Sequence, residues 1–89
     1  MIKILQAAAL IFWVIPIPAL AQKYDKAINA YAKGNFVTAM QEWKLLANDG
    51  DAIAQNMIGD FYLKGVGVPQ DYAESARGFM LAAENGLPF

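Results

Sequence analysis

The chain of 89 residues contains no cysteine and no histidine, and Ser75 is its only serine. Without cysteine it can form neither a disulfide bond nor a thiolate nucleophile, and without histidine it lacks the commonest general base. The usual ligands of structural and catalytic zinc are missing for the same reason. From these absences we expect a protein without catalytic activity, cofactor or metal.

Basic residues are also few. The chain has 7 lysines and arginines against 8 aspartates and glutamates, which gives a formal net charge of −1. Proteins that bind nucleic acids usually present a strongly basic face. We therefore expect no nucleic acid among the partners of this chain.

The N-terminal end has the three-part pattern of a secretory signal peptide. Lys3 supplies a positive charge, residues 4–14 are almost wholly apolar, and Ala19-Leu20-Ala21 offers the small side chains of a cleavage site. We expect cleavage between Ala21 and Gln22, so that residues 1–21 are a signal-peptide helix. The processed chain would then be periplasmic or secreted, with no attachment to the membrane.

An uncleaved membrane anchor is the alternative interpretation of this end. A helix over residues 4–15 would span about 18 Å at 1.5 Å per residue, whereas the bilayer core is about 30 Å thick. Pro16 and Pro18 prevent a regular helix from continuing beyond that point. The lengths therefore favour the signal peptide.

The rest of the chain contains an internal match at a shift of 36 residues. Residues 36–50 align with residues 72–86, and in each copy an aromatic residue opens the segment, a second follows seven positions later and a glycine closes it. A period in this range is typical of stacked helical repeats. We expect residues 22–89 to form one repeat domain, with its first unit at about 24–50, its second at about 51–86 and the start of a truncated third at 87–89.

Apolar residues at helical spacing predict helices at about 24–33, 36–48, 52–64 and 72–85. The short connections favour antiparallel neighbours, that is, two helical hairpins. Asp51 should cap the third helix, and Asp71 with Glu74 should form a capping box on the fourth. The expected buried faces are Tyr24, Ala27, Ile28 and Tyr31; Phe36, Ala39, Met40, Trp43, Leu46 and Ala47; Ile53, Ala54, Met57, Ile58, Phe61 and Tyr62; and Tyr72, Ala76, Phe79 and Ala83.

Residues 52–86 resemble one whole repeat of the Sel-one-like family, a branch of the tetratricopeptide superfamily. The matching positions are Ala52, Ala54, Gln55, Ile58, Gly59, Phe61, Tyr62, Gly65, Gly67, Val68, Pro69, Gln70, Asp71, Tyr72, Ala73, Ser75, Ala82, Ala83, Glu84 and Gly86. Residues 24–50 look like a shorter unit of the tetratricopeptide type. The resemblance implies an all-α fold whose two antiparallel hairpins stack as a short right-handed α-solenoid, which acts as a scaffold for protein interaction.

Several positions in this match have a physical role that can be stated in advance. Gly59 should permit a close contact between helices, and Gly65 and Gly67 should give the long loop its backbone freedom. Gly78 stands where the family usually has a large aromatic residue, so we expect looser packing there. The rings of Tyr62, Tyr72 and Phe79 should fill the space between units, and Met80 and Leu81 should be exposed on the outer side of the last helix.

In solenoids of this kind the first helix of each hairpin lines the concave face. The non-core positions of these two helices form matching stripes at i, i+4 and i+8. The stripes consist of Asp25, Asn29 and Lys33 and of Asn56, Asp60 and Lys64. A repeated stripe of acid, amide and lysine suits another protein or an extended peptide as partner, and an ordinary solvated face is the alternative.

Three other patterns favour structural roles. Residues 65–69 contain two glycines, but a phosphate-binding loop needs a third glycine and a preceding strand, and both are missing. Residues 49–51 offer only two acidic positions, fewer than a calcium loop requires. Ser75 aligns with Ala39 and is expected to pack as a small residue. The aromatic residues could form a ligand pocket, but their helical spacing is more typical of a repeat core.

These patterns indicate an exported, non-catalytic repeat scaffold that mediates protein–protein interaction in the bacterial envelope. Binding or hydrolysis of cell-wall fragments, with Asp60 or Glu74 as the acid, is one alternative. A non-functional remnant of a longer repeat protein is another. The sequence leaves the oligomeric state open.

Overall fold

The computed structural model describes residues 22–86, which form four α-helices and no strand. The helices are α3 (Asp25–Ala32), α4 (Phe36–Asn48), α5 (Ala52–Lys64) and α6 (Tyr72–Glu84). The all-α class is therefore confirmed for this part of the chain. The bounds of α4 and α5 are those predicted, whereas α3 is one residue shorter at each end and α6 ends one residue earlier. The predicted signal peptide, residues 1–21, and the predicted start of a third unit, residues 87–89, lie outside the described residues.

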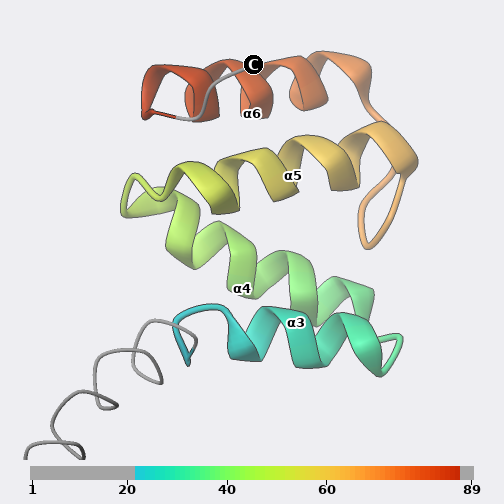
Figure 1. Cartoon of the computed structure of the whole chain (residues 1–89). Coiled ribbons are helices and arrows are strands. Elements are labelled where there is room, and N and C mark those ends of the chain that lie inside the picture. Colours follow the sequence, from blue (N-terminus) through green and yellow to red (C-terminus); the bar gives the residue numbers. More distant parts are fainter. Residues whose placement is uncertain (1–21, 87–89) are drawn as a thin grey trace, which may run out of the picture.

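The four helices pack in chain order, each against the next (Figure 1). Successive helices run in opposite directions, so α3 with α4 and α5 with α6 form the two antiparallel hairpins that the short connections predicted. Between residues 22 and 86, no helix has the length and apolar character needed to cross a bilayer.

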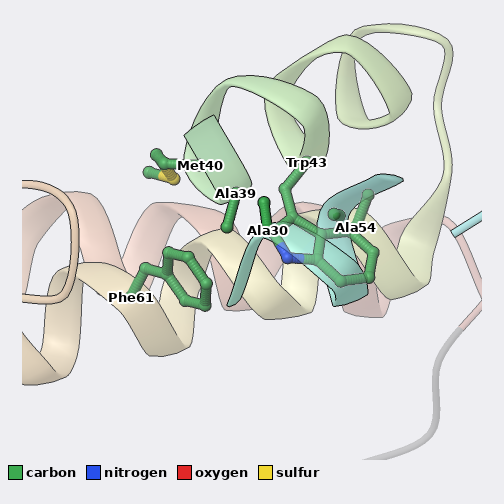
Figure 2. Packing of buried hydrophobic residues seen from close by; sticks show 7 residues of the cluster. Ala30, Ala39, Met40, Trp43, Ala54 and Phe61 are labelled. Carbon is green, nitrogen blue, oxygen red and sulfur yellow. The ribbon is translucent and has the colours of Figure 1, made fainter. Parts of the chain in front are cut away.

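The buried core joins the two hairpins through α3, α4 and α5. Its residues are Ala27, Ala30, Ala39, Met40, Trp43, Ala54 and Phe61 (Figure 2). The side chain of Trp43 is only 4% exposed, and its ring centroid lies 5.7 Å from that of Tyr24. The alanines let the three helices approach closely, so that one large ring from α4 and one from α5 fill the space among them.

The contact between α5 and α6 depends on two glycines. A Cβ atom built on Gly78 would lie 2.9 Å from the backbone nitrogen of Gly59 and 3.0 Å from the carbonyl oxygen of Gln55. The close contact predicted at Gly59 is thus confirmed, and the looser packing predicted at Gly78 is wrong. Because neither glycine has a side chain, the two backbones meet directly, and Ser75 Oγ donates a 2.7 Å hydrogen bond to the carbonyl oxygen of Gly59.

The predicted buried face of α6 is wrong in three of its four residues. The buried residues of this helix are Ser75, Gly78 and Ala82, whereas Tyr72 is 67% exposed and Ala76 and Ala83 are exposed as well. Phe79 is partly buried, and its ring packs against α5, where a Cβ atom on Gly59 would lie 2.8 Å from it. The expected exposure of Met80 and Leu81 is confirmed.

The other three helices also expose apolar residues that were predicted to be buried. Ile28 and Tyr31 on α3 are 52% and 49% exposed, and Phe36 on α4 and Ile53 on α5 are exposed as well. The packed face of α3 consists of Ala27 and Ala30, so the larger side chains beside it remain at the edge of the contact with α4. Both exposed α3 residues line a groove between α3 and α5.

The loop between α5 and α6 reaches back to the first hairpin. Gly65 ends α5 in the left-handed conformation with a φ of 70°, which makes use of the backbone freedom predicted for this position. Gly67 has the same φ, and a Cβ atom there would collide with the carbonyl oxygen of Phe36. Val66 and Val68 pack against the core cluster. The loop therefore fixes the second hairpin to the start of α4.

The predicted cap of α5 is present, and the capping box predicted for α6 is half formed. Asp51 Oδ1 accepts a 2.9 Å hydrogen bond from the backbone nitrogen of Ala54, as predicted. Asp71 Oδ1 accepts one of 3.1 Å from the backbone nitrogen of Glu74. The reciprocal bond of a capping box is not formed, because the N–H of Asp71 donates to the carbonyl oxygen of Tyr62 and the Glu74 carboxylate pairs with Arg77 at 3.3 Å.

Candidate functional site

The six polar residues predicted to form a binding face lie on α3 and α5. Four of them are exposed and two, Asn56 and Asp60, are partly buried. Asp60 pairs with Lys64 along α5, with 3.2 Å between Oδ2 and Nζ. Among residues 22–86, the side chains of the other four, Asp25, Asn29, Lys33 and Asn56, make no hydrogen bond or ion pair. These four are therefore free to contact a ligand or solvent.

A groove of about 140 Å³ lies between α3 and α5, and we name it the α3–α5 groove. It is lined by Ile28 and Tyr31 of α3, Trp43 of α4, and Met57, Asp60 and Phe61 of α5. Asp60 is the only one of the six predicted residues in this lining and also its only charged side chain. The groove thus combines apolar and aromatic side chains with a single carboxylate.

Ring contacts hold Tyr31 in place at the edge of the groove. Its ring centroid lies 5.0 Å from that of Phe36 and 5.9 Å from that of Phe61. Tilted aromatic pairs at such distances contribute about 0.5–1.5 kcal/mol beyond the burial of their area. Tyr31 therefore presents a half-exposed ring whose position is set before any ligand arrives.

The indole nitrogen of Trp43 is buried, and none of the described residues accepts a hydrogen bond from it. Figure 2 shows this nitrogen at the edge of the ring turned toward Phe61, which lines the same groove. Buried donors are nearly always paired in folded proteins, and leaving one unpaired costs about 1–3 kcal/mol. The groove therefore adjoins a donor for which the surrounding structure supplies no acceptor.

A polar cluster joins the start of α3 to the start of α5, the two helices that flank the groove. Asp51 Oδ2 accepts a 2.9 Å hydrogen bond from the hydroxyl of Tyr24 and lies 2.6 Å from Lys23 Nζ. The other oxygen of Asp51 caps α5. This places Asp51 in the turn and cap role expected for residues 49–51, and it aligns α3 with α5 across the hairpin boundary.

The same contacts shift the pKa values of all three side chains. Burial raises the pKa of Asp51, but hydrogen bonds from Lys23, the Ala54 backbone and Tyr24 outweigh it, so the pKa lies below its ordinary 3.8. The hydrogen bond to Asp51 and its negative charge raise the pKa of Lys23 above 10.5. Burial and the hydrogen bond to Asp51 raise the pKa of Tyr24 above 10.0. At neutral pH, Lys23 and Asp51 are therefore charged and paired, and Tyr24 is a neutral donor to the same carboxylate.

A second groove, of about 280 Å³, is bounded by α4, α5 and α6, and we name it the α4–α6 groove. Its lining is Lys44, Ala47, Asn48, Gln55, Ile58, Tyr62, Glu74, Arg77, Gly78 and Leu81. Asp60 and Glu74, the two acids considered for catalysis, line different grooves. They are therefore not brought together as a pair, and each has a cationic partner on its own helix.

Sequence reasoning missed most of the residues that line the α3–α5 groove. The rings of Tyr31, Trp43 and Phe61 were interpreted as repeat core, which is correct for the buried Trp43 and Phe61 and wrong for the half-exposed Tyr31. The pair Ala27 and Ala30 could have indicated the exposure of Tyr31. Where two alanines form the packed face of a helix, the larger side chains next to them lie outside the contact. Met57 carried no signal beyond its place on an apolar stripe.

Comparison with models of protein families, with curated proteins and with solved structures found no match to this chain. The resemblance of residues 52–86 to the Sel-one-like family thus remains a prediction.

Proposed function

We propose that the chain is an exported, non-catalytic repeat scaffold that binds an extended segment of another protein in the α3–α5 groove. In this proposal the two hairpins stack as a short right-handed α-solenoid of the Sel-one-like type, and the groove lies on its concave side. The observation that carries the proposal is the groove itself, which places the exposed Ile28 and Tyr31 of the first hairpin and the partly buried Met57 of the second around the buried Trp43.

Exposed apolar side chains bordered by polar ones are typical of interaction surfaces. Ile28 and Tyr31 are about half exposed at the groove. Polar residues on the same two helices, Asn29, Lys33 and Asn56, make no side-chain hydrogen bond within residues 22–86. An extended peptide can place one side chain in the groove while its backbone groups contact these amides and the lysine.

The chemistry of the lining supports a role in binding rather than catalysis. Asp60 is the only acid in the groove, and the lining contains no serine, threonine or lysine that could act as a nucleophile beside it. General acid–base catalysis needs a side chain held within hydrogen-bond reach of the proton that it transfers, and Asp60 is instead paired with Lys64.

The proposal places the mature chain outside the cytoplasm, with its N-terminus at Gln22. This cleavage would leave Lys23 and Tyr24 in the mature chain, where they contact Asp51. Expression in a bacterial host followed by intact mass measurement of the periplasmic fraction tests it. We expect the mass of residues 22–89, and recovery of only the full chain in the membrane fraction would favour the uncleaved anchor.

Site-specific photocrosslinking in cells tests the binding role. A benzophenone side chain at position 28 is expected to yield adducts that disappear when Tyr31 is changed to alanine, since both residues line the groove. Position 83, an exposed alanine on α6 outside both groove linings, is the matched control. Equal adducts from positions 28 and 83, or adducts unaffected by Tyr31→Ala, would contradict the proposal.

Binding of cell-wall fragments is the second candidate function, and the α4–α6 groove favours it. This groove is the larger of the two and is lined by Lys44, Glu74 and Arg77 together with the polar Asn48, which suits a ligand that carries carboxylates and amides. Calorimetry with purified muropeptides is the test. Heat that is lost in Arg77→Ala would support this function, and no heat with the unmodified chain would remove it.

A further inference from the structure

We infer that the α3–α5 groove is selective for the side chain of a lysine or arginine in the bound segment. This inference rests on the proposed function and names the residue that anchors the segment. It follows from the charge in the groove and from the apolar and aromatic side chains beside that charge.

The charge in the groove has one sign. Asp60 is the only charged lining residue, and its side chain is 35% exposed, so its carboxylate is partly withdrawn from water. Its partner Lys64 belongs to the same helix at i+4 and does not line the groove. Exposed pairs of this kind are weak and easily exchanged, so a cation that enters the groove can replace Lys64.

The apolar lining fits the stem of a basic side chain. Lysine and arginine bury their methylene groups along apolar surface while the charged end reaches a polar partner. Ile28 and Met57 supply such surface between α3 and α5. The Tyr31 ring, held by its contacts with Phe36 and Phe61, adds a π face to which a cation is attracted.

Other anchors fit this groove less well. An acidic side chain would meet the negative charge of Asp60, and a purely apolar one would cover that carboxylate without giving it a new partner. A basic residue avoids both costs.

The fluorescence of Trp43 provides the test, because this residue lines the groove. In the full chain with Trp13→Phe, Trp43 is the only tryptophan whether or not the signal segment is removed. The probes are the acetylated and amidated peptide Gly-Val-Lys-Val-Gly and its counterparts with glutamine or glutamate in the central position. The lysine peptide is expected to change the emission with a Kd at least tenfold below that of the glutamine peptide.

Three variants in the same background isolate the role of the carboxylate. Asp60→Asn should abolish the preference for lysine, whereas Glu84→Gln, which removes an exposed carboxylate of α6 outside both grooves, should preserve it. Lys64→Gln should tighten binding of the lysine peptide, because it removes the competing cation. If Asp60→Asn unfolds part of the chain, seen as a loss of helical circular dichroism, Lys64→Gln still tests whether the Asp60 carboxylate binds the lysine.

The outcomes separate the inference from the function on which it rests. Equal affinity for the lysine and glutamine peptides would overturn the basic anchor while leaving the groove as a peptide site. The absence of any emission change with all three peptides, at concentrations where the chain remains folded, would overturn both. A preference for lysine that survives Asp60→Asn would overturn the assignment to this carboxylate.

Discussion

The hydroxyl of Tyr24, at the start of α3, donates a 2.9 Å hydrogen bond to Asp51, the residue that caps α5. These two helices belong to different hairpins and form the two sides of the candidate groove. One carboxylate therefore both caps α5 and contacts the residue at the start of α3, across the boundary between the two hairpins. The width of the groove depends on this contact and on the core rings between the helices.

The double role of Asp51 predicts a larger loss of stability than a cap alone would give. Asp51→Ala is expected to lower the free energy of unfolding by about 2–3 kcal/mol, since it removes the cap and the buried hydrogen bond from Tyr24. Asp71→Ala, which removes only the cap of α6, should cost about 1 kcal/mol. Urea unfolding followed by circular dichroism measures both, and equal losses would contradict the role assigned to Tyr24.

The shifted pKa values predict how stability depends on pH. Because the pKa of Asp51 is lowered by folding, its contribution is complete above the ordinary value of 3.8 and is lost as the pH falls below it. The raised pKa values of Lys23 and Tyr24 give contributions that are complete below about 10 and are lost as the pH rises further. Unfolding curves of Asp51→Asn should therefore show a weaker dependence below about pH 4 than those of the unmodified chain.

Two glycine substitutions can separate the stability contributed by the loop contact at Gly67 from the cost of a side chain in the left-handed conformation. Gly34 and Gly67 both have positive φ values, 80° and 70°, but a Cβ atom at Gly34 would meet nothing within 4 Å. Gly34→Ala should cost about 1–2 kcal/mol from the left-handed conformation. Gly67→Ala should cost about 1–3 kcal/mol more, because its methyl group would push against the Phe36 carbonyl. Equal losses in urea unfolding would show that the loop does not press against α4.

The glycine contact between α5 and α6 predicts a substitution with an unusual sign. Alanine in place of glycine normally favours a helix by about 1 kcal/mol. Gly78→Ala should instead destabilise the chain by about 1–2 kcal/mol, since its methyl group would overlap backbone atoms of α5 that cannot move aside. Ala76→Gly, at an exposed position of α6, is the reference for propensity and should cost about 1 kcal/mol. A gain of stability in Gly78→Ala would refute the close contact.

Cooperative unfolding distinguishes a working domain from a remnant of a longer repeat protein. The core that spans α3, α4 and α5 and the direct contact of α5 with α6 should give one sharp transition. Coincident curves from circular dichroism and from Trp43 emission, measured in the Trp13→Phe chain, are the expected result. A broad transition, or two curves that do not coincide, would favour the remnant.

The sequence predicted the helices better than it predicted their packed faces. Local signals such as the Asp51 cap and Gly65 at the end of α5 fixed the bounds of the elements. On α6, however, the stripe of Ser75, Gly78 and Ala82 and the predicted stripe of Tyr72, Ala76, Phe79 and Ala83 both have helical spacing, and of the predicted stripe only Phe79 packs on α5. Which stripe is buried depends on how closely the backbones of α5 and α6 approach, and that is not encoded in the period of one helix.

The candidate groove was predicted only through Asp60, for a similar reason. A groove arises where helices from different hairpins stand apart, so its lining depends on the distance between α3 and α5 rather than on either helix alone. Tyr31 was expected to be buried because its spacing matched Tyr24 and Ala27. Its partial exposure results from the small side chains of Ala27 and Ala30, which form the packed face of α3.

Two-dimensional NMR of the isotope-labelled chain during addition of the lysine peptide tests the groove most directly, since the indole N–H of Trp43 gives a signal of its own. We predict that this signal and the amides of Ile28, Tyr31, Met57 and Asp60 shift together with one saturating dissociation constant. Shifts confined to the exposed side of α6, around Tyr72 and Met80, or no shift at saturating peptide, would contradict the assignment of binding to the α3–α5 groove.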